Sequence, residues 1–169
     1  SGEDDRKSAI RGSELNVAEL AEMLGPQWHI LYRAHGYVAN QGMRKKTAAV
    51  TDVSRVADIN DLYVAADALV TDYSSVMFDF AVMSKPMVFF TADFDEYSKS
   101  RGAYFDIELM APGPVARSTE EVAKALSSGD LDNEHWQVRR DGFKHYFAPW
   151  DDGNATNRVV DAFFGELVK

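Results

Sequence analysis

No cysteine occurs among the 169 residues. This absence excludes disulfide bonds and thiolate metal sites, and it leaves the redox compartment undetermined. Apolar runs near the roughly 20 residues that span a membrane are also absent. The first residues, Ser1 to Lys7, lack the apolar core of a signal peptide. We therefore expect residues 1–12 to be a mobile leader, followed by one domain over residues 13–169.

Positive charge is scarce, because 18 Lys and Arg residues stand against 27 Asp and Glu residues and give a net charge of −9. A generally acidic surface disfavours nucleic acids and anionic membranes, although backbone dipoles and a few cations still suffice to bind one phosphate ligand. With four histidines and no cysteine, we predict no metal site. The acidic cluster of Asp93, Asp95 and Glu96 suits a cation, but such clusters on acidic proteins are usually solvated.

The sequence also lacks a Gly-x-Gly-x-x-Gly motif and a Walker loop, so it gives no support to a dinucleotide or ATP site. What it does contain is an alternation of strand-like and helix-like stretches, which predicts the α/β class with a Rossmann-like parallel sheet. The strand-like runs cover residues 29–33, 48–51, 68–71 and 87–90. The helical patterns cover residues 13–24, 58–66, 76–83, 119–126, 133–146 and 154–168. Three of these helices begin at a residue suited to cap them, namely Ser13, Asp58 and Thr119.

Parts of this pattern carry further predictions. Residues 68–71 form a continuous apolar run, which is typical of a strand buried on both faces. From Thr91 to Arg117 the pattern loosens into a polar region with glycine and proline, and we predict no regular element there. The last helix carries an apolar stripe made of Val159, Val160, Phe163, Phe164 and Leu167.

Ligands of open parallel sheets bind outside the carboxyl ends of the strands. The loops expected at this edge are residues 35–36, 53–55, 72–75 and 91–93. The third loop opens a helix, whose free N–H groups and positive dipole end suit a phosphate, and the hydroxyls of Ser74 and Ser75 add donors. Plain N-capping by serine is the alternative, and for a serine pair taken alone it is the more common role.

Charged candidates lie near the same edge. His35 follows the first strand close to Arg33, and it either holds or protonates a phosphoryl oxygen or is a loop histidine bonded to the backbone. Asp79 lies one turn after the serine pair, where it either orients that loop or faces solvent. Arg101 lies in an aromatic loop that either closes over a nucleotide or only packs.

Several segments, taken in order, resemble the CDP-glycerol:poly(glycerophosphate) glycerophosphotransferase family. The segment Ala68–Asp79 is similar to the family's D-x-L-[IV]-T-D-Y-S-S-x-x-F-D pattern. The other matching segments are Arg33–His35, Asp58–Tyr63, Lys85–Phe90, Asp93–Tyr97, Arg101–Asp106, Ala111–Pro114, Asp152–Ala155 and Arg158–Val160. The resemblance covers about residues 28–165, and Ala103 departs from it, since the family usually has a bulky aromatic residue there.

The resemblance implies a GT-B architecture, of which this chain matches the C-terminal, nucleotide-donor half. The implied reaction moves glycerol phosphate from CDP-glycerol to a polyglycerophosphate acceptor on a lipid carrier, at the cytoplasmic face of the membrane. It releases CMP and uses no cofactor. The N-terminal half, expected to supply the general base, has no counterpart in this sequence. The implied roles are catalysis by His35, donor phosphate binding by Ser74, Ser75 and Arg101, and support of these groups by Arg33, Asp72 and Asp79.

Alternatives remain open at this point. The enzyme could use another donor, such as CDP-ribitol, or be the primase that adds the first glycerol phosphate. The chain could also be a nucleotide-binding module that kept the fold and lost the reaction. A general glycosyltransferase donor domain would bind a UDP- or GDP-sugar, which the sequence Asp72–Ser75 disfavours.

Overall fold

Helices and strands alternate along the chain in the computed structural model, which describes residues 15–34, 47–92 and 106–165. The strands are β1 (Ile30–Tyr32), β2 (Val50–Asp52), β3 (Leu69–Thr71), β4 (Met87–Phe90) and β5 (Val115–Ala116). The helices are α2 (Val17–Leu24), α3 (Ile59–Ala65), α4 (Val76–Ala81), α6 (Ile107–Met110), α7 (Thr119–Ser127), α8 (Glu134–Phe147) and α9 (Ala155–Phe164), and a 3-10 turn, η2, covers Asp130–Asp132.

All strand pairs in the described ranges are parallel. β1 pairs with β2, with Ile30 opposite Val50. β3, β4 and β5 form a second sheet in that order, and Phe89 of β4 lies opposite Val115 of β5. Parallel neighbours need a crossover connection, and α4 lies in the connection from β3 to β4 and α6 in that from β4 to β5. The predicted α/β class with a Rossmann-like parallel sheet is therefore confirmed.

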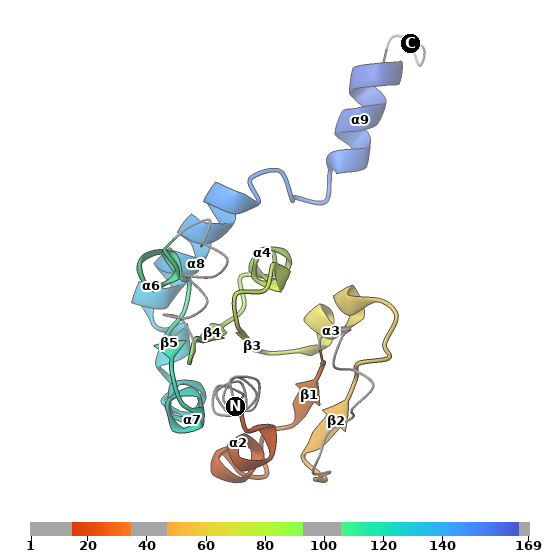
Figure 1. Cartoon of the computed structure of the whole chain (residues 1–169). Coiled ribbons are helices and arrows are strands. Elements are labelled where there is room, and N and C mark those ends of the chain that lie inside the picture. The colour runs from red at the N-terminus through yellow and green to blue at the C-terminus, as the bar shows by residue number, and fades with distance from the viewer. Residues whose placement is uncertain (1–14, 35–46, 93–105, 166–169) are drawn as a thin grey trace, which may run out of the picture.

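Helices cover both faces of the β3–β4–β5 sheet. On one face α2 packs against α7, and their apolar residues enclose Val88 and Ala116 together with Ile30 of β1. On the other face α4, α6 and α8 surround Met87 and Phe89 (Figure 1). Successive β4 side chains thus enter two different cores, as the two-residue repeat of a strand requires.

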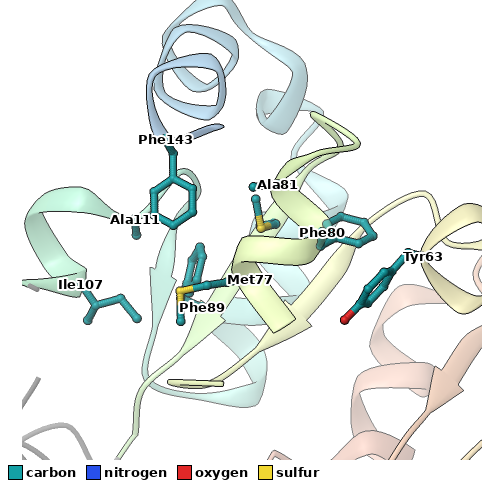
Figure 2. Packing of buried hydrophobic residues seen from close by; sticks show 9 residues of the cluster. Tyr63, Met77, Phe80, Ala81, Phe89, Ile107, Ala111 and Phe143 are labelled. Atoms are coloured by element: carbon teal, nitrogen blue, oxygen red, sulfur yellow. The ribbon is translucent and has the colours of Figure 1, made fainter. Parts of the chain in front are cut away.

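Aromatic side chains of α4 contact those of α3 and α8, and Figure 2 shows Phe80 of α4 beside Tyr63 of α3. Phe80 is fully buried and meets the ring of Tyr63 edge-on, with 5.8 Å between the ring centroids. Phe78, on the same helix, stacks on Phe143 of α8 at 5.7 Å. Because burying one Phe side chain contributes about 1.5–3 kcal/mol, these contacts hold α4 between α3 and α8.

Two predictions, on the burial of β3 and on the region after Thr91, are wrong in part. β3 is half-buried rather than buried on both faces, because it forms the edge of its sheet and pairs with β4 alone among the described strands. β4 is the central strand, and its residues Met87, Val88 and Phe89 are fully buried. The region from Thr91 to Arg117, where we expected no element, contains α6 and β5, which are too short to give a visible period in the sequence.

Two helix caps also differ from the predictions. α2 begins after Asn16 rather than after Ser13, which lies outside the described residues. The Asn16 side chain accepts a bond from the N–H of Glu19 at 3.3 Å and donates to its carboxylate at 2.9 Å, which makes a reciprocal cap. α7 is capped by Ser118, and the expected cap, Thr119, is its first helical residue.

The remaining boundaries agree closely with the sequence pattern, except at the end of α4 and at the end of α9, which stops at Phe164 rather than at residue 168. Asp58 caps α3 as predicted, and Asn133 caps α8. α4 ends at Ala81 rather than at Met83, because the chain tightens there and Ser84 takes a left-handed φ of 53°.

The C-terminal helix α9 is not packed as its apolar stripe suggests. None of its residues is buried, and the helix stands away from the rest of the domain (Figure 1). Four large apolar side chains of the stripe, Val159, Val160, Phe163 and Phe164, are exposed. The fifth, Leu167, lies outside the described residues.

Candidate functional site

An aspartate side chain shapes the turn between β3 and α4. Asp72 Oδ1 accepts a hydrogen bond from the backbone N–H of Ser74 at 2.9 Å. Aspartate side chains commonly accept such a bond from the backbone N–H two residues later in the chain. The bond turns the chain and leaves the serine hydroxyls free of this task. Ser74 is half-buried and Ser75 is exposed at the start of α4.

Ser75 occupies the N-cap position of α4, but its side chain caps no backbone N–H. Its backbone is helical, with φ −60° and ψ −12°, whereas a capping serine usually has extended geometry. Ser74 and Ser75 take part in the first turn through their carbonyl groups, which accept bonds from Met77 and Phe78 at 3.3 and 3.0 Å. Plain capping therefore does not account for the Ser75 hydroxyl.

Cationic side chains of α8 hold the opposite end of α4. Lys144 Nζ donates to the carbonyl of Val82 at 2.8 Å, and Arg140 Nε donates to the carbonyl of Ser84 at 3.1 Å. Arg140 is buried, and its Nη1 also donates to the carbonyl of Leu131 at 2.6 Å. The start of α4 therefore belongs to a helix whose other end is held in place by α8.

Arg33 ties together the loops that follow β1 and β2. Its Nη1 donates to the carbonyls of Val53 at 3.4 Å and of Val56 at 2.8 Å. The N–H of Ala34 donates to Ser54 Oγ at 2.9 Å. Arg33, predicted as a supporting residue, therefore lies at the edge where β1 and β2 end, with its guanidinium on backbone carbonyls.

Tyr63 of α3 brings a buried hydroxyl into the same region, although Tyr63 is not among the site residues predicted from the sequence. Its Oη makes no hydrogen bond of normal geometry within the described residues. Burial raises the pKa of the Tyr63 phenol, the negative charge of Asp79 raises this pKa further, and the positive charge of Arg33 lowers it. Arg33 and Asp79 are therefore both close enough to the Tyr63 phenol to affect its pKa. The only sequence signal was that Tyr63 ends the matching segment Asp58–Tyr63.

Lys85 fixes the end of α3 and was also missed. Its Nζ donates to the carbonyls of Tyr63 at 3.2 Å, Val64 at 2.9 Å and Ala66 at 2.7 Å. A lysine that satisfies the last carbonyls of a helix also complements the negative end of the helix dipole. Lys85 therefore couples the loop after α4 to the helix that carries Tyr63.

Thr91 directly follows the central strand β4 and carries a second buried hydroxyl. The residue is 1% exposed, and its Oγ1 has no hydrogen-bond partner among the described residues. Its N–H donates to the carbonyl of Ala116 at 2.8 Å, so the strand itself is paired up to this point. Leaving a buried hydroxyl unpaired costs about 1–3 kcal/mol, so this strand end offers a donor to a further group.

His35 and Arg101 lie outside the described residues, as do Asp93, Asp95, Glu96 and Ala103, so their predicted roles stay predictions. Within residues 15–34, 47–92 and 106–165, no group of three or more His, Asp or Glu side chains is arranged to hold a metal ion. None of the helices in these ranges is both long enough and apolar enough to cross a membrane.

A surface pocket of about 390 Å³ opens elsewhere, beside β5. Arg117 forms an ion pair with Glu108 there, and the guanidinium of Arg139 lies 5.8 Å from the centre of the Trp136 ring. The lining residues are Glu108, Ala111, Gly113, Val115, Arg117, Glu121, Trp136 and Arg139. No predicted site residue is among them, so this pocket and the start of α4 are separate features.

Comparison with known proteins shows that the chain is similar to part of several teichoic acid enzymes. A family model described as CDP-Glycerol:Poly(glycerophosphate) glycerophosphotransferase matches residues 3–165. The teichoic acid poly(glycerol phosphate) polymerase of Bacillus subtilis (strain 168) is 36% identical over 153 residues, which cover 89% of this chain and 20% of that protein. The teichoic acid poly(ribitol-phosphate) polymerase of Bacillus spizizenii (strain ATCC 23059 / NRRL B-14472 / W23) is 34% identical over 149 residues, 87% of this chain and 23% of that protein.

A solved structure of the wall teichoic acid polymerase TagF, soaked with CDPG, has the same fold. Its TM-score with this chain is 0.77 at 32% identity, and the match covers 90% of this chain and 38% of that chain. The likeness therefore runs through nearly all of this chain, while the chain spans well under half the length of the relatives it matches.

Proposed function

This chain belongs to the CDP-glycerol:poly(glycerophosphate) glycerophosphotransferase family, and we propose that it is the donor-binding half of such an enzyme. In this proposal the enzyme transfers glycerol phosphate from CDP-glycerol to a teichoic-acid-like polymer and releases CMP. The observation that carries the proposal is the match to the family over residues 3–165.

The start of α4 is the proposed site of the donor pyrophosphate. Ser74 and Ser75 supply hydroxyl donors, and the capping role that would otherwise occupy Ser75 is not used. Asp72 holds the turn through the N–H of Ser74, so the backbone that carries the serine pair is shaped before a ligand arrives. A preformed site spends less binding free energy on ordering itself, which supports this assignment.

The proposed reaction forms one bond and breaks one bond at phosphorus. The oxygen of the terminal glycerol hydroxyl of the acceptor bonds to the β-phosphorus, and the bond from that phosphorus to the bridging oxygen of CMP breaks. The hydroxyl proton passes to a general base outside this chain. Charge grows on the leaving oxygen, and we assign its stabilisation to His35 and Arg101 by family resemblance.

The rest of the catalytic unit is proposed to lie in the part of the relatives that this chain does not match. We infer a GT-B arrangement, with the acceptor on a lipid carrier and the reaction at the cytoplasmic face of the membrane. The donor is the substrate, and the proposal includes no cofactor and no nucleic acid.

A second donor has support of its own. Poly(ribitol-phosphate) polymerase is among the similar proteins, at 34% identity, which is close to the 36% of the poly(glycerol phosphate) polymerase. CDP-ribitol differs from CDP-glycerol in the polyol and not in the nucleotide, so both donors would use the same pyrophosphate site. Primase and polymerase activities differ in the acceptor, which this half would not select.

Calorimetric titration with CDP-glycerol, CDP-ribitol, CMP and UDP-glucose tests the proposal. We expect the cytidine ligands to bind and UDP-glucose not to bind. The double variant Ser74→Ala/Ser75→Ala should weaken cytidine diphosphate binding at least tenfold, or about 1.4 kcal/mol. Its matched control, Ser127→Ala/Ser128→Ala, changes a serine pair at the far end of α7 and should bind normally. Preference for UDP-glucose would contradict the proposal, and preference for CDP-ribitol would identify the other donor.

A further inference from the structure

β5 forms an edge of the β3–β4–β5 sheet and has a neighbouring strand on one side only among the described residues (Figure 1). The carbonyls of Pro114 and Ala116 accept hydrogen bonds from β4 at 2.8 Å each. Because successive residues of a strand direct their backbone groups to opposite sides, the N–H and the carbonyl of Val115 face away from β4. The edge therefore presents one backbone donor and one acceptor with which no described strand pairs.

The next outward-facing position of this edge is already covered by a side chain. The N–H of Arg117 donates to Glu121 Oε2 at 2.6 Å. The carboxylate thus occupies the place that a carbonyl of a neighbouring strand would take. The open part of the edge is therefore short and is centred on Val115.

Two pockets flank this part of the edge, one toward each face of the sheet. The pocket of about 390 Å³ is bordered by α6 and α8, which cover one face. A second pocket, of about 260 Å³, is bordered by α7 and η2 on the other face. Val115, Glu121 and Trp136 line both pockets. Since successive side chains of a strand point to opposite faces, a segment paired with Val115 would place one side chain in each pocket.

The pocket beside α6 and α8 contains a cation without an acidic partner. Arg139 Nε donates to the carbonyl of Ala111 at 3.0 Å, and its guanidinium lies 5.8 Å from the centre of the Trp136 ring. None of the ion pairs among the described residues includes Arg139, whereas Arg117 in the same pocket is paired with Glu108. An acidic side chain placed in this pocket would pair with Arg139, because guanidinium groups bind carboxylates in a two-pronged geometry.

The pocket beside α7 favours a different side chain. Ala116, Ala125 and Leu131 contribute to its lining, and Ala116 and Leu131 belong to the apolar core between the sheet and α7. The charged residues of this pocket, Lys124 and Asp130, are exposed to solvent. A small apolar side chain would therefore be covered by apolar atoms here, which is favourable.

We propose that the β5 edge binds an extended peptide segment of a partner protein, which joins the sheet as a further strand and carries an acidic residue next to a small apolar residue. Val115 supplies the main-chain hydrogen bonds, and Arg139 pairs with the acidic side chain. Strand addition of this kind takes its affinity from main-chain bonds and its specificity from pockets for alternate side chains. The proposal goes beyond donor binding and does not depend on which donor the enzyme uses.

Other occupants fit the groove less well. Symmetric pairing of two copies through β5 is disfavoured, because each edge lies between two pockets and recessed edges do not reach each other. A polyanionic polymer would meet the carboxylates of Glu108 and Glu121 in the groove and a net charge of −9 on the chain. An extended peptide, by contrast, offers the donor and acceptor that match the N–H and carbonyl of Val115.

Selection from a displayed library of random segments of about nine residues tests the proposal on the 169-residue chain. Segments with an acidic residue next to a small apolar residue should be enriched at least about tenfold over a parallel selection on Val115→Pro. Proline removes the outward N–H, and edge strands tolerate proline where that N–H faces away from the sheet. Val115→Thr keeps the N–H and is the matched control, so it should enrich the same segments. If the wild type enriches no segment above Val115→Pro, the proposal is wrong.

Methylation of single amides in a synthetic copy of the most enriched segment gives a second test, which leaves the protein unchanged. Methyl groups on the amides that face β5 should weaken binding at least about tenfold, and those on the alternate amides should weaken it less than about threefold. Exchanging the acidic residue of the segment for lysine should also cost at least about tenfold. Fluorescence anisotropy of the labelled segment measures each affinity.

Three results would overturn the proposal. They are losses without a two-residue alternation, equal affinity for the acidic and the lysine segment, and full binding by a Val115→Pro variant whose circular dichroism shows that it is folded. Since none of these measurements uses a nucleotide donor, a negative result would leave the proposed transferase function unaffected.

Discussion

Asp72 accepts a hydrogen bond from the backbone N–H of Ser74 at 2.9 Å, immediately before α4 begins. This contact links the end of β3 to the proposed phosphate site, because it sets the path of the backbone that carries Ser74 and Ser75. The serine hydroxyls need not shape the turn themselves, and the exposed Ser75 side chain makes no capping bond.

Replacing Asp72 should weaken donor binding in a graded way. Asp72→Ala removes the acceptor, and we expect CDP-glycerol affinity to fall about fivefold, since one such bond contributes about 1 kcal/mol. Asp72→Asn keeps a side-chain oxygen at this position and should lose no more than about twofold. Titration calorimetry on the two variants measures both effects, and equal losses in both would show that charge rather than turn geometry matters here.

Tyr63→Phe should stabilise the domain. The Tyr63 hydroxyl is buried and interacts with Asp79, but it makes no hydrogen bond of normal geometry among the described residues, and a poorly paired buried polar group costs about 1–3 kcal/mol. We expect the free energy of unfolding in urea to rise by about 1 kcal/mol. Tyr146→Phe removes an exposed hydroxyl and should change it by less than about 0.5 kcal/mol. A loss of stability in Tyr63→Phe would mean that this hydroxyl is bonded in solution.

The same tyrosine predicts a loss of stability in alkali. Burial, and then the charge of Asp79, raise the pKa of Tyr63 above its ordinary value of 10.0. The folded state therefore holds the phenolic proton more tightly than the unfolded state, so stability is complete below about pH 10 and falls as the pH rises toward the folded-state pKa. Unfolding free energies measured between about pH 9 and 11 should fall less steeply in Tyr63→Phe than in the wild type; parallel curves would contradict this.

Lys85→Met should destabilise the domain by about 2 kcal/mol, because charged hydrogen bonds contribute about 1.5–3 kcal/mol each and the freed carbonyls regain water. Lys85 Nζ bonds to the carbonyls of Tyr63, Val64 and Ala66. Lys124→Met, on the exposed side of α7, provides the comparison and should be nearly neutral. Similar urea midpoints for the two variants would argue against Lys85 as the anchor of α3.

Two glycines should respond in opposite directions to alanine. A Cβ at Gly113 would lie 1.8 Å from the backbone carbonyl oxygen of Met87, so Gly113→Ala must push β5 away from β4. We expect it to cost about 3 kcal/mol or to prevent folding, as severe overpacking does. Gly142 lies within α8 with open space around its Cβ position, and Gly142→Ala should add about 0.5–1 kcal/mol of stability. Circular dichroism during thermal unfolding distinguishes these outcomes.

The sequence predicted the elements that have a strong local signal. The apolar run Met87–Phe90 is β4 itself, and Asp58 caps α3, because each depends on residues next to one another in the chain. β5 has two residues, and its pairing with β4 is a long-range contact that no local pattern reports. The burial expected of β3 failed for a similar reason, since the position of a strand within a sheet depends on its neighbours.

The residues of the candidate site likewise differ in whether the local sequence predicts them. Asp72, Ser74 and Ser75 could be selected because they follow one another between a strand and a helix. Tyr63 and Lys85 could not, since their roles come from contacts between α3, α4 and the loop after α4, which the fold alone creates. The stripe on α9 was recognised, but a period of 3.6 residues shows that a face is apolar and not what covers it.

A transfer assay with the intact enzyme tests whether the start of α4 holds the donor pyrophosphate during glycerol phosphate transfer. Labelled CDP-glycerol and a polyglycerophosphate acceptor are supplied to the wild type, to Ser74→Ala/Ser75→Ala and to the control Ser127→Ala/Ser128→Ala. We predict that the wild type and the control release as much CMP as they join glycerol phosphate to polymer. The Ser74/Ser75 variant should lose at least about 90% of both, equivalent to about 1.4 kcal/mol or more. Full transfer by the Ser74/Ser75 variant, or CMP release without polymer growth in the wild type, would contradict it.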